Sequence, residues 1–207
     1  MDITIIGTGN MARGIATRAL AGGHGVTLIS HTPGKAQVVA GELDGSVQAG
    51  DPGSAITGDV VVLAVPYGAI DDVVATYGAQ LGGRWWSTPP LRSTSRRSPR
   101  STSRLARPPR RSAKKVPEAK VVKAFNTTFA ATLPEGKVPG EPLDVFIASD
   151  DEDAKAVLRQ LVEDAGLRAV DVGPLARARQ LEALAYVHMA VQQPLGTGFS
   201  SALKIIA

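Results

Sequence analysis

The feature that most constrains the fold is a glycine turn near the start of the chain. It joins a short apolar run at residues 3–6 to a helix predicted over 11–21. Gly7 permits the tight turn, Gly9 has no side chain and lets a pyrophosphate approach the main chain, and Ala12 is small enough for helix and strand to pack closely. The positive end of the helix dipole would then face the pyrophosphate. This context predicts a dinucleotide site built from Gly7, Thr8, Gly9, Asn10 and Met11.

Beyond this turn, apolar runs alternate with helical patterns along the chain. We predict further strands over residues 26–30, 59–66, 120–125, 143–149 and 168–172, and helices over 35–43, 70–77, 151–165 and 175–191. Such alternation predicts an α/β fold of the Rossmann type, with a doubly wound, mostly parallel sheet. We expect residues 1–172 to form the dinucleotide-binding domain and residues 173–207 a C-terminal helical cap.

The segment 84–112 does not fit this pattern, although the fifth strand of such a sheet should lie there. It is rich in Arg, Ser, Pro and Thr, with few apolar residues after two tryptophans. Residues 85–112 are either a basic insert or the product of a reading-frame slip, because a one-base shift can restore strand and helix patterns. We favour the slip and assign these residues no function.

The basic character of the chain comes from this segment alone. The formal net charge is +4, but eleven of the 23 Lys and Arg residues lie between Arg84 and Lys115, where there is no Asp or Glu. The rest of the chain has twelve Lys and Arg against nineteen Asp and Glu, a net charge of −7. We therefore expect no nucleic-acid partner.

Cysteine is absent from the chain, which excludes disulfides, thiolate nucleophiles and cysteine metal sites. No charged and apolar leader precedes the first strand, and no apolar run is long enough to cross a bilayer. We expect a soluble, cytoplasmic protein without a membrane partner.

The end of the second predicted strand indicates which dinucleotide is bound. NAD-specific sites place an acid there to hold the ribose hydroxyls. This chain instead has Ser30, His31 and Thr32, with Lys35 just beyond and no carboxylate. Hydroxyl donors and an ammonium group attract a 2′-phosphate, which an acid would repel. The pattern therefore predicts NADP, with His31 bonding the phosphate or stacking on adenine.

At this point the chain resembles the coenzyme F-420-dependent NADP oxidoreductases, which are small Rossmann proteins related to the N-terminal domain of pyrroline-5-carboxylate reductase. The resemblance covers nearly the whole chain except residues 85–112. It rests on Ile5-Ile6-Gly7-Thr8-Gly9-Asn10-Met11, Ser30-His31-Thr32 with Lys35, Ala64-Val65-Pro66-Tyr67, Val121-Val122-Lys123-Ala124-Phe125-Asn126-Thr127, Asp171-Val172-Gly173-Pro174-Leu175, Arg179 with Leu181-Glu182, Gly196-Thr197-Gly198 and Leu203-Lys204-Ile205.

The resemblance implies hydride transfer between NADP(H) and a deazaflavin, coenzyme F-420, in a possible homodimer. It implies that the adenosine 2′-phosphate is held by Thr8, Ser30, His31 and Lys35. Val65, Pro66 and Tyr67 would lie over the dinucleotide toward its nicotinamide end. Asn126 and Thr127 would border the nicotinamide and deazaflavin rings, and the Gly196-Thr197-Gly198 loop would close the pocket.

Hydride transfer between stacked rings depends on the distance between the rings, on their orientation and on exclusion of water. It does not require a strong acid or base. The three histidines form no triad. His24 is expected to be structural. His188 is a pocket candidate, although its apolar helical face favours a packed core role. Glu182 and Arg179 either form an ion pair or line the pocket.

We expect no metal site, because the acids at 150–153 are better explained as charges at a helix N-terminus. Two other functions stay open. One is NADPH-dependent reduction of a small imine or carbonyl, with Tyr67 or His188 as proton donor. The other is a non-catalytic module that senses NADP. The sequence does not fix the direction of hydride transfer or the oligomeric state.

Overall fold

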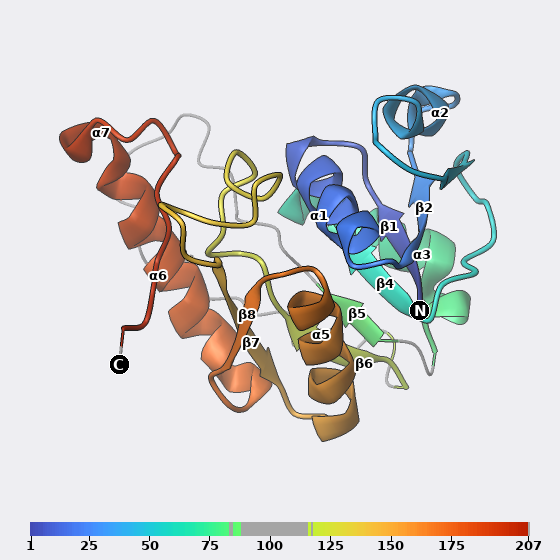
Figure 1. The fold of residues 1–207 in the computed structure, drawn as a ribbon. Helices are drawn as coiled ribbons and strands as arrows, with labels where there is room; N and C mark the ends of the chain where they lie inside the picture. The colour runs from blue at the N-terminus through green and yellow to red at the C-terminus, as the bar shows by residue number, and fades with distance from the viewer. Residues whose placement is uncertain (83–84, 88–115, 117, 207) are drawn as a thin grey trace.

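Eight strands form one sheet in the computed structural model, which describes residues 1–82, 85–87, 116 and 118–206 (Figure 1). The strand order is β3-β2-β1-β4-β5-β6-β7-β8. Neighbouring strands are parallel except for β6 and β7, which are antiparallel. The predicted Rossmann-type, mostly parallel sheet with a C-terminal helix is therefore confirmed.

The strands are β1 (Asp2–Ile6), β2 (Gly25–Ile29), β3 (Val47–Gly50), β4 (Val60–Leu63), β5 (Trp85–Ser87), β6 (Lys120–Lys123), β7 (Asp144–Ser149) and β8 (Arg168–Asp171). The helices are α1 (Asn10–Ala21), α2 (Lys35–Ala40), α3 (Ile70–Leu81), α5 (Glu152–Asp164), α6 (Ala178–Ala190) and α7 (Gln192–Leu195), with 3-10 turns η1 (Tyr67–Ala69) and η3 (Leu175–Arg177).

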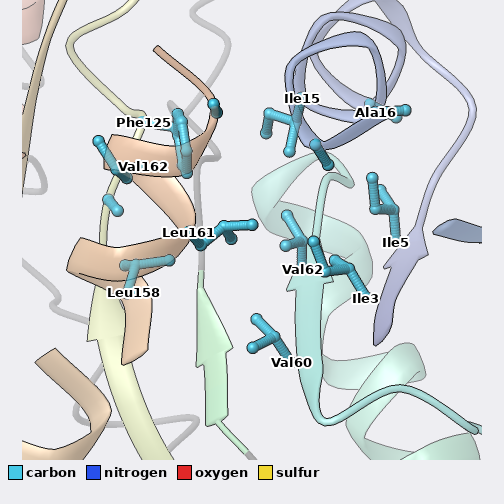
Figure 2. Close-up of a cluster of buried hydrophobic side chains, with 14 of the residues drawn as sticks. Ile3, Ile5, Ile15, Ala16, Val60, Val62, Phe125, Leu158, Leu161 and Val162 are labelled. Atoms are coloured by element: carbon cyan, nitrogen blue, oxygen red, sulfur yellow. The ribbon is translucent and has the colours of Figure 1, made fainter. Parts of the chain in front are cut away.

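Helices cover both faces of the sheet, as a doubly wound fold requires. One core contains apolar residues of α1, α2 and α5 packed on β1, β2, β4, β6 and β7. Figure 2 shows part of it, where Ile15 of α1, Val62 of β4 and Leu161 of α5 lie close together. A second core places α3 and the start of α6 against the opposite face. The strands are thus buried on both sides, which explains their nearly continuous apolar sequences.

The edge strand β3 is missing from the sequence prediction. Its residues, 47–50, show neither an apolar run nor clear alternation, and only pairing with β2 makes them a strand. The helix predicted over 35–43 ends at Ala40, and the strand predicted over 59–66 ends at Leu63. These differences arise because tertiary pairing, and not local propensity, sets where a strand or helix ends.

The fifth strand is present, contrary to our view that residues 85–112 as a whole do not fit the sheet. Trp85–Ser87 pairs in parallel with β4 on one side and β6 on the other. Two neighbouring strands impose the extended state here on a sequence that gives little pattern by itself. The other residues of the segment, 88–112, lie outside the described residues, so the insert and the frame slip both stay predictions.

The segment after α7 folds back along the sheet and is anchored there. Asp144, at the start of β7, accepts two hydrogen bonds from the Arg168 guanidinium at 2.8 and 2.5 Å and a third from the Ile205 N–H at 2.9 Å. Leu203 packs against the small core between α6 and β7. Within the described ranges, no helix combines the length and apolar character needed to cross a membrane.

Candidate functional site

The glycine turn after β1 has the geometry that the sequence predicts. Gly7 has a φ of +129°, which side chains rarely adopt, and its N–H donates to the Ile29 carbonyl at 2.8 Å. A Cβ at this position would lie 2.8 Å from the carbonyl carbon of Ala64, which follows β4. Gly7 is therefore required both for the turn and for the close approach of β1 and β4.

Gly9 leaves open space where α1 begins. A Cβ built on it meets no atom within 4 Å, so the strand and helix themselves do not require glycine there. No side chain caps this helix end and no acidic residue lies in its first turn. The first N–H groups of a helix have no intrahelical acceptor, so this end fits the pyrophosphate of a dinucleotide. Thr8 is nearly buried at the turn, whereas Asn10 is exposed and Met11 half-buried.

The turn after β2 separates one buried residue from three exposed ones. Ser30 is buried, and its Oγ accepts a hydrogen bond from the Thr32 N–H at 3.1 Å. His31, Thr32 and Lys35 are exposed. Lys35 has no ion pair in the part of the chain that the structure describes. Ser30 thus shapes the turn, and the three exposed side chains are available to an anion.

An acid also lies at this turn, contrary to the expectation that it has none. Asp51 follows β3, and its Oδ1 accepts a hydrogen bond from the Gly34 N–H at 2.9 Å. No acid follows β2 in sequence, but sheet pairing brings one from the neighbouring strand. Because the strand β3 was not predicted, no local pattern placed this carboxylate at the turn.

The residues after β4 lie at the same edge of the sheet as the glycine turn, because β1 and β4 are parallel neighbours. Val65 is half-buried and packs with the second core, while Pro66 and Tyr67 are exposed. Tyr67 begins the 3-10 turn that leads into α3. These three residues therefore border the carboxyl edge next to Gly7.

The loop after β6 contains buried polar groups that have no hydrogen-bond partner among the residues that the structure describes. Phe125 has a φ of +59°, a left-handed conformation that is strained for a bulky residue, and its ring packs in the core shown in Figure 2. Asn126 follows with both amide atoms unpaired, and the hydroxyls of Thr127 and Thr128 are also unpaired among the described residues. All three residues are at least nine-tenths buried. Buried polar groups are usually hydrogen-bonded, so a bound ligand or ordered water would satisfy these groups.

This loop is adjacent to the helix that follows the glycine turn. A Cβ at Gly14 in α1 would lie 2.7 Å from the Leu133 Cβ, so the chain after Asn126 packs directly on α1. The β6 strand runs parallel to β5, and thus to β4 and β1, so its carboxyl end meets the same edge as theirs. The open helix end and the unpaired groups therefore share one edge, the usual ligand side of such sheets.

His188 connects this loop to the chain after α7. Its ring is buried; Nδ1 lies 3.2 Å from the Thr127 carbonyl oxygen and Nε2 lies 2.9 Å from Ser201 Oγ. The ring stacks on Phe129 at 4.2 Å. Burial lowers the pKa of His188 and outweighs the opposing effect of the Thr127 carbonyl. Both ring nitrogens are engaged by protein groups, so His188 holds the loop in place.

Lys123 and Glu182 form a buried ion pair at the end of β6. The sequence left open whether Arg179 and Glu182 pair with each other or line the pocket. In the structure Glu182 pairs with Lys123, and Arg179 is exposed. The Lys123 side chain is only 3% exposed, and burial lowers its pKa even though Glu182 opposes the shift. The pair fixes α6 against the sheet. The sequence signal for this ion pair was a charged residue at the end of an apolar strand.

The acids before α5 have structural roles, as expected. Asp151 caps the helix by accepting a hydrogen bond from the Ala154 N–H at 2.8 Å. Asp150 accepts one from the Leu175 N–H at 2.9 Å, and Asp153 pairs with Lys120. His24, also expected to be structural, is buried beside Asp164 at 3.5 Å, and burial lowers its pKa.

Comparison with known proteins agrees with the geometry of the site. Residues 2–84 match the family model described as NADP oxidoreductase coenzyme F420-dependent, which confirms the resemblance stated from the sequence. A solved structure from Arthrobacter sp. that carries the name of an F420-dependent NADP-reductase is 25% identical, with a TM-score of 0.86 and complete coverage of both chains.

Two further matches cover a smaller share of the other protein. Metalloreductase STEAP3 from Rattus norvegicus is 26% identical over 185 residues; the match covers 88% of this chain and 36% of that relative. This chain thus spans about a third of the length of the curated relative. An imine reductase from Streptomyces aurantiacus is 19% identical with a TM-score of 0.67, covering 96% of this chain and 64% of that one, which shows the shared fold alone. The comparisons support an NADP-dependent oxidoreductase.

Proposed function

We propose that this chain transfers hydride between NADP(H) and a deazaflavin coenzyme, because residues 2–84 match the family model described as NADP oxidoreductase coenzyme F420-dependent. The observation that carries the proposal is the set of buried polar groups on Asn126, Thr127 and Thr128 that have no hydrogen-bond partner within the described part of the chain. They lie at the same sheet edge as the open end of α1. A ligand that spans both places would satisfy the main-chain N–H groups at one end and these side chains at the other.

The chain's contribution in this proposal is binding and orientation. The N–H groups of Gly9, Asn10 and Met11 bind the pyrophosphate. The exposed side chains of His31 and Lys35 bind the adenosine 2′-phosphate. Thr8, Ser30 and Thr32 support the same end of the cofactor, while Val65, Pro66 and Tyr67 cover it toward the nicotinamide.

At the other end, the Asn126 amide has a donor and an acceptor that no group in the described ranges pairs with. This combination matches a ligand amide, such as the carboxamide of a nicotinamide, better than a purely apolar ring face. When bound, the nicotinamide supplies or accepts the hydride. Thr127 and the Gly196-Thr197-Gly198 loop would orient the two rings and exclude water, and no residue of the chain needs to act as a strong acid or base.

The rival reduction of an imine or carbonyl needs a proton donor, and the two candidates differ in their surroundings. His188 is engaged at both ring nitrogens by Thr127 and Ser201. Tyr67 is partly exposed at the end of β4. The deazaflavin reaction requires neither residue, and this favours it over the rival. A sensing module would bind NADP(H) at the same place without turnover.

The test is a coupled binding and turnover experiment on the purified chain. NADPH is first titrated in a calorimeter, and oxidised coenzyme F-420 is then added while its visible absorbance is followed. We expect binding and a loss of absorbance that tracks NADPH consumption. Binding with turnover of a cyclic imine or a small carbonyl, but not of the deazaflavin, would contradict the proposal in favour of the rival. Binding without turnover on any acceptor would favour the sensor.

A matched pair of variants ties the activity to the site. Asn126→Leu removes the unpaired amide with little change in volume, and we expect it to abolish most turnover. Tyr67→Phe removes the alternative proton donor and should leave deazaflavin turnover within about twofold. Loss of turnover in Tyr67→Phe with full activity in Asn126→Leu would reverse the assignment.

A further inference from the structure

The end of β3 lies directly beside the turn that follows β2. In the sheet register Ile29 pairs with Gly50, and the Ser30 N–H donates to the Gly50 carbonyl at 3.2 Å. Ser30 and Asp51, which follow this residue pair, therefore lie at the same end of the two strands. This pairing puts Asp51 next to the turn of residues 31–35, although Asp51 is 17 residues from Gly34 in sequence.

The carboxylate of Asp51 is part of this turn. Its Oδ1 accepts the Gly34 N–H at 2.9 Å, and Gly34 has a φ of +73°. Ser30 Oγ accepts the Thr32 N–H, and the Lys35 N–H donates to the Thr32 carbonyl at 3.2 Å. The turn is thus held from inside by Ser30 and from the neighbouring strand by Asp51, with His31, Thr32 and Lys35 left exposed.

Asp51 differs from Glu42, one of the two acids between α2 and β3. Glu42 pairs with Arg13 of α1, so its charge is matched. Asp51 is exposed, and no cation pairs with it within the ranges that the structure describes. Its negative charge is therefore uncompensated at the turn where the 2′-phosphate of the proposed cofactor would bind. Like charges at close range repel even in high dielectric.

We propose that Asp51 is a specificity-determining residue that holds the 31–35 turn in shape and, by its charge, limits the preference for NADP(H) over NAD(H). The inference rests on the proposed function, because it assumes that the turn binds the adenosine end of the dinucleotide. Lys35 and His31 attract the 2′-phosphate, whereas Asp51 repels it. The preference for NADP(H) over NAD(H) is therefore weaker than it would be at a turn with no acid at all.

The test is Asp51→Asn, which keeps an oxygen acceptor for the Gly34 N–H and removes only the charge. Dissociation constants for NADP⁺ and NAD⁺ are measured by calorimetry for both chains. We expect NADP⁺ to bind the variant about 3- to 10-fold more tightly, with NAD⁺ unchanged within about twofold. The gain should shrink at high salt, because salt screens exposed charges.

Asp44→Asn is the matched control. It removes the same charge from the opposite end of β3, ahead of Val47, and should change neither dissociation constant. If the wild-type chain binds neither dinucleotide, the proposed function fails. If the wild-type chain binds NADP⁺ and Asp51→Asn leaves the ratio of the two constants unchanged, or if Asp44→Asn gives the same gain, only the present inference is overturned.

Discussion

The two ends of the candidate site are built in different ways. The glycine turn after β1 offers main-chain N–H groups, and the residues that form it are neighbours in sequence. The loop after β6 offers side chains, and its supports come from far away: His188 is 61 residues from Thr127, and Glu182 comes from α6 to meet Lys123. A site made of main-chain N–H groups thus depends on local geometry, whereas a site made of side chains depends on long-range packing.

The largest expected effect concerns the long-range support. In Glu182→Gln the Lys123 ammonium keeps its buried place and loses its carboxylate. Breaking a buried pair in this way costs about 3–5 kcal/mol of unfolding free energy, which urea denaturation measures. Arg179→Gln, one turn earlier on α6 and exposed, should change stability by less than about 0.5 kcal/mol. Equal effects of the two variants would mean that the pair does not hold α6.

The next effect separates two glycines of the same turn. Gly7→Ala forces a side chain into a positive φ and against Ala64, and should cost about 3 kcal/mol or more of unfolding free energy. Gly9→Ala enters open space and should leave the fold within about 1 kcal/mol of wild type, while NADP⁺ binding is lost because the methyl group occupies the approach to the helix end. Thermal unfolding and calorimetry give both values. Retained binding in Gly9→Ala would break the main-chain interpretation.

A smaller effect should appear in the opposite direction at the β6 loop. Asn126→Leu replaces an unpaired buried amide by an apolar side chain, so we expect unchanged stability or a gain of about 1 kcal/mol in the free protein. The same change should lower kcat/KM roughly 5- to 150-fold, which corresponds to about 1–3 kcal/mol of lost hydrogen bonding to ligand. A loss of stability without loss of activity would make Asn126 a structural residue.

The smallest effect is on pH dependence. Burial lowers the folded-state pKa of His188, so the unfolded chain binds more protons than the folded chain as pH falls through the unfolded value of about 6.5. Stability should therefore fall from about pH 7 downward and level off below the folded-state pKa. His188→Asn should show a shallower fall between pH 7 and 5 in urea titrations.

The strand and helix predictions are correct where a local sequence pattern sets the structure. They fail where pairing between strands of the sheet sets it. The run at 3–6 and the glycines after it predicted β1, the turn and α1, because each residue's role depends on its neighbours along the chain. The edge strand β3 has no such pattern, and Trp85–Ser87 becomes a strand only between β4 and β6. Asp51 was missed as a consequence, since it reaches the turn only through β3.

Local sequence was enough to predict the glycine turn after β1 and most strands and helices, although not β3 or β5. These predictions follow from backbone preference and apolar periodicity over a few residues, whereas the roles expected for the residues after β6 came from the family resemblance. Tertiary packing was needed to show that Lys123 pairs with Glu182, that Asn126 has no partner among the described residues and that Asp51 lies beside Gly34. Such contacts depend on which distant elements pack together, and local sequence does not encode that choice.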